Sequence, residues 1–600
     1  MGAGARNPAR ALPFAGPRRG AGGALPANPR EDLVTFFSMA PPLASGLTAP
    51  SGSGEDPGAT ASSQRAHAHL FRRISLGQPS VPGPEARTQA AGILGPPSPG
   101  MTVREHSPER DPDFQGTSPE SLLAELRALL PPASLVTDEE LLRPYECDGL
   151  SAYRRLPLAV ALPEDEAQVV AVLAACHRAG IPVVPRGAGT GLSAGSMPHP
   201  QGILLSLAKL NRILHLDPLA RVAVVQTGVR NLAISEAALP HGLYYAPDPS
   251  SQIACTIGGN VAENAGGVHC LKYGLTVHNV LRLRIVTIEG DILELGSQAL
   301  DAPGLDLLAL FIGSEGLLGV VTEVTVRLIP RPRTAQCLMA SFDDVRKAGE
   351  AVAAVIAAGS IPAGLEMMDR GVTAAVEPFV HAGYDLDAAA ILLCEADGTA
   401  QEVAEEIARM RAVLERGGAT GIRVSRDEAE RIRFWAGRKA AFPSAGRISP
   451  DYYCMDGTIP RKRLGDMLTA IAAMEVTYGL RCINVFHAGD GNLHPLILYD
   501  ANVAGQLERT EAFGAEILRL SVALGGTITG EHGVGFEKLD AMCGQFLPDE
   551  LKVFHGIKRA FDPQGLLNPV KAIPSLHRCA EMGRMRVHQG NLPFPELERL

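Results

Sequence analysis

The sequence lacks three patterns, and each absence excludes a class of protein. Its ten cysteines include no C-x-x-C pair, so neither a zinc ribbon nor a cysteine-ligated iron–sulfur cluster is indicated. No run of about 18 apolar residues occurs, so no transmembrane helix is predicted. The net charge of −10 offers no basic field for nucleic acid. We therefore expect a cytoplasmic protein that does not act on nucleic acid.

Residues 1–100 contain no lysine and are rich in glycine, alanine, proline and serine. Such a composition buries too little apolar surface to offset the entropy lost on ordering, so this segment is predicted to be disordered. Two interpretations remain open. The segment is an organellar targeting leader, or the true start lies at or near Met101. We favour the later start because residues 1–100 show no clear amphipathic helix.

The rest of the chain predicts an α+β protein of two main domains. Residues 101–153 form a helical lead-in, with one helix from Ser118 to Leu130. Strands and helices alternate over 154–333 around a loop-rich middle, which predicts a first domain. A second set of strands and helices over 334–573 predicts a domain that carries the substrate site. Residues 574–600 form a tail for which we have no function.

One glycine-rich segment, Pro185–Gly195, directly follows a predicted buried strand at Ile181–Pro185. Glycines let backbone N–H groups approach a phosphate closely and adopt positive φ angles. The segment is not a dinucleotide fingerprint of the G-x-G-x-x-G type, because Leu192 and Ala194 occupy the final glycine position in the two possible alignments. By itself it is compatible with a phosphate cradle or with a tight turn.

Three further stretches of this domain have similar character: Pro247–Ser251, Thr256–Gly267 and Gly313–Thr322. Several close backbone approaches in one domain suit a long ligand with a pyrophosphate and a flat ring system. Taken in order, the four segments resemble the vanillyl-alcohol-oxidase (PCMH) type of FAD-binding domain. The resemblance implies FAD, held without a covalent bond at His269 or Cys270. It implies FAD contacts from Arg186, Gly187, Gly189, Thr190, Gly191, Ser193, Pro247, Ser250, Gly258, Gly259, Asn260, Asn264, Gly266, Gly267, Gly319 and Val321.

Two histidines and a glutamate form a second candidate site. Residues 482–497 read as strand, turn and strand, which brings His487 and His494 together. The segment 530–535 adds Glu531 and His532. Two histidines with one glutamate suit Zn²⁺, Mn²⁺ or Fe²⁺ with open positions. A single histidine on a strand is more often a core residue, so the prediction depends on the combination.

These motifs resemble the FAD-linked oxidases of 2-hydroxy acids, a family that includes glycolate oxidases, D-lactate dehydrogenases and D-2-hydroxyglutarate dehydrogenases. The resemblance implies that His487, His494 and Glu531 hold the metal and that His532 is the general base. Arg438 is then the candidate clamp for the substrate carboxylate. Metal-assisted deprotonation of the hydroxyl would accompany hydride transfer to the flavin.

The substrate is predicted from two departures within this family. The 2-hydroxyglutarate branch carries a lysine and an asparagine where this chain has Cys454 and Leu496, so a small monoacid is expected. From about residue 120 onward the chain resembles the flavin subunits of bacterial glycolate oxidases. That implies oxidation of glycolate to glyoxylate, with electrons passed to further subunits, including an iron–sulfur subunit, at the inner face of the cytoplasmic membrane.

Three alternatives stay open. D-lactate differs from glycolate by one methyl group, which a pocket distinguishes by only about 1–3 kcal/mol. The second alternative is a non-catalytic flavoprotein that relays electrons, but the presence of all four motif residues, His487, His494, Glu531 and His532, disfavours it. A metal-dependent hydrolase without flavin is disfavoured by the glycine-rich segments.

Overall fold

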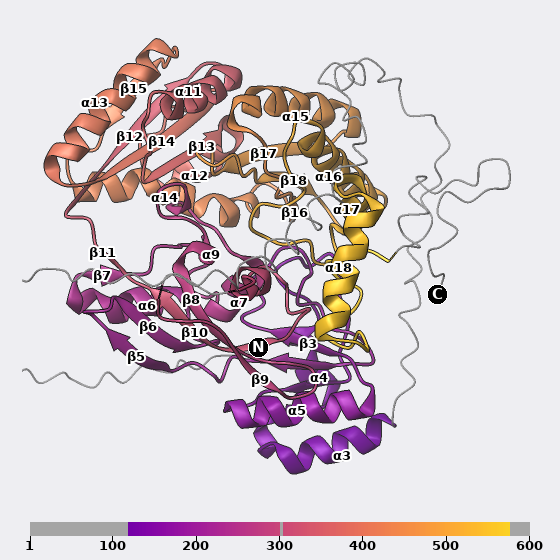
Figure 1. Ribbon diagram of the computed structural model, residues 1–600. Coiled ribbons are helices and arrows are strands. Elements are labelled where there is room, and N and C mark those ends of the chain that lie inside the picture. Colours follow the sequence, from indigo (N-terminus) through magenta and orange to yellow (C-terminus); the bar gives the residue numbers. More distant parts are fainter. Residues whose placement is uncertain (1–117, 300–303, 576–600) are drawn as a thin grey trace, which may run out of the picture. The chain divides into compact units, whose positions relative to one another are not determined.

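The computed structural model describes residues 118–299 and 304–575 (Figure 1). The predicted disordered segment 1–100 and nearly all of the predicted tail lie outside the described residues. Among the described helices, none combines the length and the apolar character needed to cross a membrane.

The lead-in begins with the predicted helix. Helix α3 spans Pro119–Leu129, and the Ser118 side chain accepts a hydrogen bond from the Ser121 backbone N–H as its N-cap. Leu122 and Leu126 are buried on one face and join the core cluster of α5 (Glu166–Ala179). A short helix, α4 (Glu139–Leu142), follows with Asp138 as its N-cap. The side chains that cap both helices were readable from the sequence.

The first domain contains two main sheets. The smaller has the order β1-β2-β4-β3, in which β2, β4 and β3 are parallel and β1 is antiparallel. The larger is antiparallel with the order β5-β6-β10-β8-β9. The strands are β1 (Leu135–Val136), β2 (Ala159–Ala161), β3 (Val183–Arg186), β4 (Ile203–Ser206), β5 (Ile213–Asp217), β6 (Val222–Gln226), β8 (Val280–Val286), β9 (Ile292–Gly296) and β10 (Val320–Arg327).

Two edge strands of the larger sheet, β5 and β9, were not expected from the sequence. Neither has more than one buried side chain, so neither shows the alternation of apolar and polar residues that reveals a half-buried strand. The inner strands β6, β8 and β10 instead carry mostly buried side chains. Buried strands carry a recognisable apolar pattern and exposed edge strands do not. The inner strands are therefore the ones that a sequence reveals.

The second domain is built on one antiparallel sheet with the order β15-β12-β14-β13-β17-β18-β16. Along β12, Leu338, Ala340 and Phe342 join one core cluster, whereas Cys337 and Met339 join another. Because alternate side chains point to opposite faces, both faces of the sheet are covered. The strands are β12 (Thr334–Phe342), β13 (Gly364–Asp369), β14 (Ala390–Gly398), β15 (Gly421–Val424), β16 (Asp451–Cys454), β17 (Arg481–Phe486) and β18 (Pro495–Tyr499).

The helices of this domain divide between the two faces (Figure 1). Helices α11 (Val345–Ala357), α13 (Ala400–Arg416), α15 (Leu464–Tyr478) and α16 (Gln506–Ala523) contribute to one cluster. Helices α12 (Arg370–Val380) and α14 (Glu428–Ala445) contribute to the other.

After α17 (Leu539–Gln545) and α18 (Pro548–Phe561) the chain returns to the first domain. Leu567 pairs with Val183 of β3 as a parallel bridge. The Asn568 amide donates hydrogen bonds to the backbone oxygens of Gly195 and Glu315, both in glycine-rich segments. The last described residues therefore hold the glycine-rich loops in place.

Candidate active site

The glycine-rich loop after β3 packs closely against α7 (Ile257–Glu263). A Cβ atom on Gly187 would lie 2.3 Å from Thr256 Oγ1, and one on Gly258 would lie 1.7 Å from Thr227 Oγ1. No side chain fits at either position without displacing its neighbour. The Gly258 N–H donates to the Thr227 backbone oxygen at 2.8 Å, which fixes the start of α7. The close contacts that a Cβ would make explain why these positions are glycine.

We expect Gly258→Ala to weaken FAD retention severely, because the added methyl must displace the buried Thr227 or the first turn of α7. Overpacking of this kind costs about 1–3 kcal/mol. Purification with the visible spectrum recorded, together with thermal unfolding, measures both effects. Gly556→Ala in α18 is the matched control, since a Cβ there meets no atom within 4 Å. A yellow Gly258→Ala protein as stable as the control would contradict the prediction.

A cavity of about 490 Å³ joins this loop to the histidine site. Two buried polar atoms of residues in its wall, Asn260 Nδ2 and Asp148 Oδ2, have no hydrogen-bond partner within the described structure. A cavity of this size, lined by a glycine-rich loop and by unsatisfied polar atoms, fits a bound flavin nucleotide. The predicted residues that line it are Arg186, Gly187, Gly189, Thr190, Gly191, Ser250, Gly258, Gly259, Asn260, Gly319, Val321, His494, Glu531 and His532.

Three of the predicted cofactor side chains make contacts that support loops. The Arg186 guanidinium donates to the Cys147 backbone oxygen at 2.7 Å and lies over the Tyr145 ring. Asn264 Oδ1 accepts from the Val277 N–H at 2.9 Å, and Ser193 Oγ donates to the His532 backbone oxygen at 2.9 Å.

The other predicted residues outside the cavity wall act through their backbone. The Pro247 backbone oxygen accepts from the Asn231 amide at 3.0 Å. Gly266 lies against the metal-site candidate, since a Cβ there would be 2.5 Å from Glu531 Oε2. Gly267 has a φ of +154°, and a Cβ there would touch the Asp248 backbone. Gly266 therefore lets the first domain approach the histidine site, and Gly267 lets two segments of the first domain pack closely.

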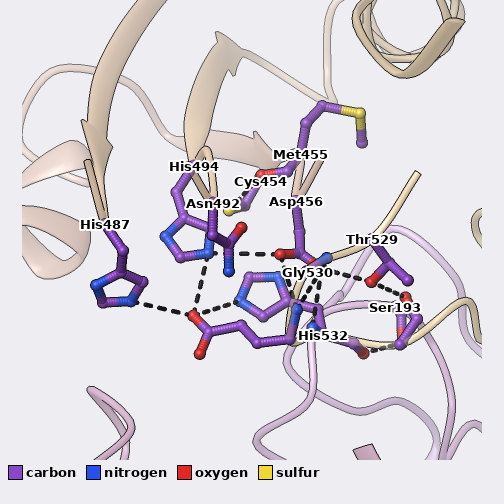
Figure 2. A network of polar contacts seen from close by, with 12 residues as sticks. Ser193, Cys454, Met455, Asp456, His487, Asn492, His494, Thr529, Gly530 and His532 are labelled. Atoms are coloured by element: carbon purple, nitrogen blue, oxygen red, sulfur yellow. Dashed lines mark hydrogen bonds and ion pairs between the residues drawn. The ribbon is translucent and has the colours of Figure 1, made fainter. Parts of the chain in front are cut away.

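His487 and His494 lie side by side at the ends of the strand–turn–strand segment, and His532 of the 530–535 segment lies beside them (Figure 2). His487 follows β17 and His494 precedes β18, and their Nε2 atoms lie 3.3 and 3.2 Å from Glu531 Oε1. The His532 ring stacks on the His494 ring with centroids 4.8 Å apart. His487, His494 and Glu531 thus offer three ligand atoms within 4.8 Å of one another.

Glu366 on β13 orients His487, a role that the sequence analysis missed. Its Oε1 lies 2.7 Å from His487 Nδ1 and its Oε2 lies 2.6 Å from Arg438 Nε. The bond at Nδ1 leaves His487 Nε2 for the site, which is the usual arrangement behind a metal-bound histidine. The only sequence signal was a charged residue between the apolar Leu365 and Met367, inside a strand that ends with Asp369.

Asp456, just after β16, holds the loop of residues 530–535 (the 530–535 loop) and was also missed. It accepts hydrogen bonds from the backbone N–H groups of Gly530, Glu531 and His532, the last at 2.8 Å. Lys538 Nζ lies 3.2 Å away, and both side chains are fully buried. Burial alone would raise the pKa of Asp456, but Lys538 and the nearby histidines hold it well below its ordinary value.

The first domain holds the other end of the same loop. Glu315 accepts hydrogen bonds from the N–H groups of Val534 and Gly535, both at 2.7 Å. Ser193 binds the His532 carbonyl. The 530–535 loop is therefore fixed by side chains of both domains.

The histidines of the site differ in the direction of their pKa shifts and therefore in the charge that each favours. Burial lowers the pKa of His532 to about 4, with Asp456 opposing this effect and His494 adding to it. Burial would also lower the pKa of His487, but the carboxylates of Glu366 and Glu531 raise it well above its ordinary value. His532 is thus neutral near pH 7, whereas the position of His487 favours a positive charge.

Comparison with known protein families identifies the class of protein to which this chain belongs. The family model of the FAD binding domain matches residues 157–296, and that of the FAD linked oxidases, C-terminal domain, matches residues 331–572. The chain belongs to the FAD-linked oxidases and is an FAD-dependent oxidoreductase. The expected α+β fold and the expected flavin are thereby confirmed.

Individual proteins of known name share extended sequence similarity with this chain. The glycolate oxidase subunit GlcD of Escherichia coli K12 is 62% identical over 489 residues, covering 81% of this chain and 97% of that protein. GlcD of Bacillus subtilis is 37% identical, covering 71% and 91%. The D-lactate dehydrogenase of Anaerostipes hadrus is 31% identical, covering 76% and 98%.

A solved structure supports the fold. p-Cresol methylhydroxylase with substrate bound has a TM-score of 0.65 at 18% identity, covering 76% of this chain and 97% of that one. The likeness agrees with the vanillyl-alcohol-oxidase type of architecture expected from the glycine-rich segments.

Proposed function

We propose that this chain is the flavin subunit of a glycolate oxidase and converts glycolate to glyoxylate. The observation that carries the proposal is the single cavity that joins the flavin loops to His494, Glu531 and His532. Identity of 62% to a glycolate oxidase subunit supports glycolate as the substrate. D-lactate is the second candidate, because a relative at 31% identity is a D-lactate dehydrogenase.

We further propose that His487, His494 and Glu531 hold a divalent metal ion, either Zn²⁺, Mn²⁺ or Fe²⁺. The donor set fits, since His487 Nε2 is freed by the bond at Nδ1 and neither ring nitrogen of the buried His494 has a hydrogen-bond partner within the described structure. When bound, the metal would polarise the substrate hydroxyl and the flavin would accept the hydride.

The side chains supply the remaining steps. The neutral His532 ring takes the hydroxyl proton of the substrate, because its low pKa leaves it unprotonated near pH 7. Arg438 is the proposed carboxylate clamp. Its Nε is bonded to Glu366, while its Nη2 is buried and has no hydrogen-bond partner within the described residues. Glu366 thus positions both Arg438 and His487.

We propose that the substrate is a small monoacid and not a dicarboxylic acid. Cys454 and Leu496 are partners across the β16–β18 pair, and both are buried in an apolar cluster. A second substrate carboxylate at this place would lose its hydration without gaining a cation. We therefore place glycolate or D-lactate ahead of 2-hydroxyglutarate.

We propose that the electrons leave through further subunits, including an iron–sulfur subunit. Neither group of side chains able to hold a metal, within the described residues, contains a cysteine. We place the assembly in the cytoplasm, at the inner face of the membrane through those subunits. A relay role without catalysis is less well supported, because His494, Glu531 and His532 line the cavity of the flavin loops and His487 lies 3.3 Å from Glu531.

Glu366→Gln tests the metal proposal. The amide loses the charge that orients His487, and the loss of such a partner lowers metal affinity about 10–100-fold. Metal content after dialysis, measured by elemental analysis, is the readout, and Glu402→Gln on the exposed start of α13 is the control. Metal content equal to that of the control would contradict the assignment of His487.

The function itself is tested by flavin reduction and dye reduction with glycolate and D-lactate in parallel. We expect glycolate to react at least as well as D-lactate, and chelation to abolish both reactions. Activity with D-lactate alone would show that D-lactate, and not glycolate, is the substrate. It would leave the proposals on the flavin and the metal unchanged. A yellow protein whose flavin neither acid reduces would favour the relay role.

A further inference from the structure

A second, larger cavity of about 1010 Å³ lies beside the catalytic one. Its wall combines residues of the first domain, such as Tyr244, with residues of α13 and α14 from the second. The segment 248–253 separates the two cavities, since Asp248 and Gln252 line the larger one while Ser250 and Ile253 line the catalytic one. The two spaces are therefore neighbours across one short stretch of chain.

Lys439 on α14 lines both cavities. It directly follows Arg438, but the two side chains differ in environment. Arg438 is 2% exposed and paired with Glu366, whereas Lys439 is exposed. Lys439 thus presents a cation at the place where the larger cavity borders the catalytic one.

The acidic residues of the larger cavity are largely neutralised by partners. Asp248 pairs with His269 at 2.7 Å, Glu395 pairs with Arg431 at 2.7 Å, and Asp397 pairs with Lys272. Burial would lower the pKa of His269, but Asp248 and Glu395 raise it to about 10, so that this partner carries a positive charge near pH 7. Of the other acids of the wall, Glu428 shares Arg431 and Glu236 pairs with Arg230 at 3.9 Å, while Asp427 caps α14 and has no ion pair among the described residues. Five of the six acids of the wall therefore have a cationic partner.

Three cations of the wall have no ion pair with any described residue: Arg331, Arg333 and Lys439. Arg331 and Arg333 lie on the exposed link between β11 (Ile329–Pro330) and β12. Unpaired cations around a cleft raise the local concentration of small anions and speed their association.

We infer that the larger cavity is the vestibule through which the carboxylate substrate enters, and that Arg331, Arg333 and Lys439 guide it. The inference rests on the proposed function, because a 2-hydroxy acid is an anion near pH 7. Lys439 passes the anion from the vestibule into the catalytic cavity, whose wall includes His532. The three cations affect substrate capture and not the chemical step.

The test is stopped-flow reduction of the flavin in the full-length protein by glycolate, at several ionic strengths. The triple variant Arg331→Gln, Arg333→Gln and Lys439→Gln should lower the second-order rate constant about tenfold at low salt. The difference should shrink as salt rises, because exposed charges are screened. The limiting rate at saturating glycolate should fall far less. Lys439→Arg should restore most of the Lys439 contribution.

The matched control removes three exposed cations elsewhere: Arg411, Arg519 and Lys552, each changed to glutamine. A triple variant that behaves like this control would overturn the inference that the larger cavity is the entry route of the substrate. A fall in the limiting rate without salt dependence would also overturn it, because that would indicate damage to the site. A wild-type flavin that no 2-hydroxy acid reduces would instead overturn the proposed function on which the inference depends.

Discussion

Replacing His532 by glutamine is expected to slow flavin reduction by glycolate about a thousandfold, while FAD and metal stay bound. Glutamine nearly fills the space of the ring but cannot take the hydroxyl proton. The His532 backbone, which bonds to Asp456 and Ser193, is unchanged, so the 530–535 loop should keep its shape. Stopped-flow reduction at saturating glycolate, with flavin and metal content measured on the same sample, is the experiment.

His215→Gln, on the exposed face of β5, is the control for the histidine change itself. A His532→Gln rate within threefold of this control would remove His532 from the role of base. A slow variant that has also lost metal would assign the effect to the ligands and not to the proton transfer.

The pH dependence gives a second measurement of the same residue. Burial lowers the pKa of His532 to about 4 from an ordinary value of 6.5. A base must be unprotonated to act, so activity due to His532 should be lost only as the pH falls through about 4. The logarithm of kcat/KM should therefore be level with respect to this residue between about pH 5 and pH 8. A fall in kcat/KM centred near pH 6.5 would instead show that the base is a histidine of ordinary pKa.

Replacing Lys538 by methionine is expected to lower the free energy of unfolding by about 3–5 kcal/mol. The Lys538 ammonium and the Asp456 carboxylate are both fully buried, 3.2 Å apart. Removing the cation leaves a buried carboxylate with hydrogen bonds but without its counter-charge. Urea unfolding of the FAD-bound protein measures the loss. Lys552→Met, whose partner Asp549 is 90% exposed, should change stability little.

The double variant Asp456→Asn and Lys538→Met separates the ion pair from the packing. If the buried pair is responsible, the double variant should lose clearly less than the sum of the two single losses. Strict additivity would show that the two residues stabilise the protein independently.

What the sequence could predict depended on how far apart along the chain the interacting residues are. The glycine-rich segments and the His487–His494 hairpin are local patterns, so their chemistry was visible before the fold. Glu366 pairs with Arg438 across 72 positions, and Glu315 binds Val534 across 219. Such partners leave no local spacing to detect.

The same reasoning applies to the cofactor side chains. Arg186 stands in the expected motif, yet its guanidinium binds the Cys147 carbonyl. The glycine content of the loop could be recognised in the sequence, and the structure places this loop in the wall of the cavity. The sequence could not assign the direction of a long side chain, which is decided by neighbours such as Tyr145 that precede the motif by some forty residues.

The double attachment of the 530–535 loop has a thermodynamic consequence. Glu315 and Ser193 hold it from the flavin domain, while Asp456 holds it from the domain that carries the histidines. A bound flavin that orders the first set would also order Glu531 for the proposed metal, and the proposed metal would likewise order the flavin side. Binding linkage requires the two effects to be equal. Flavin and metal should therefore act as mutual heterotropic effectors, each raising the affinity of the protein for the other by the same factor.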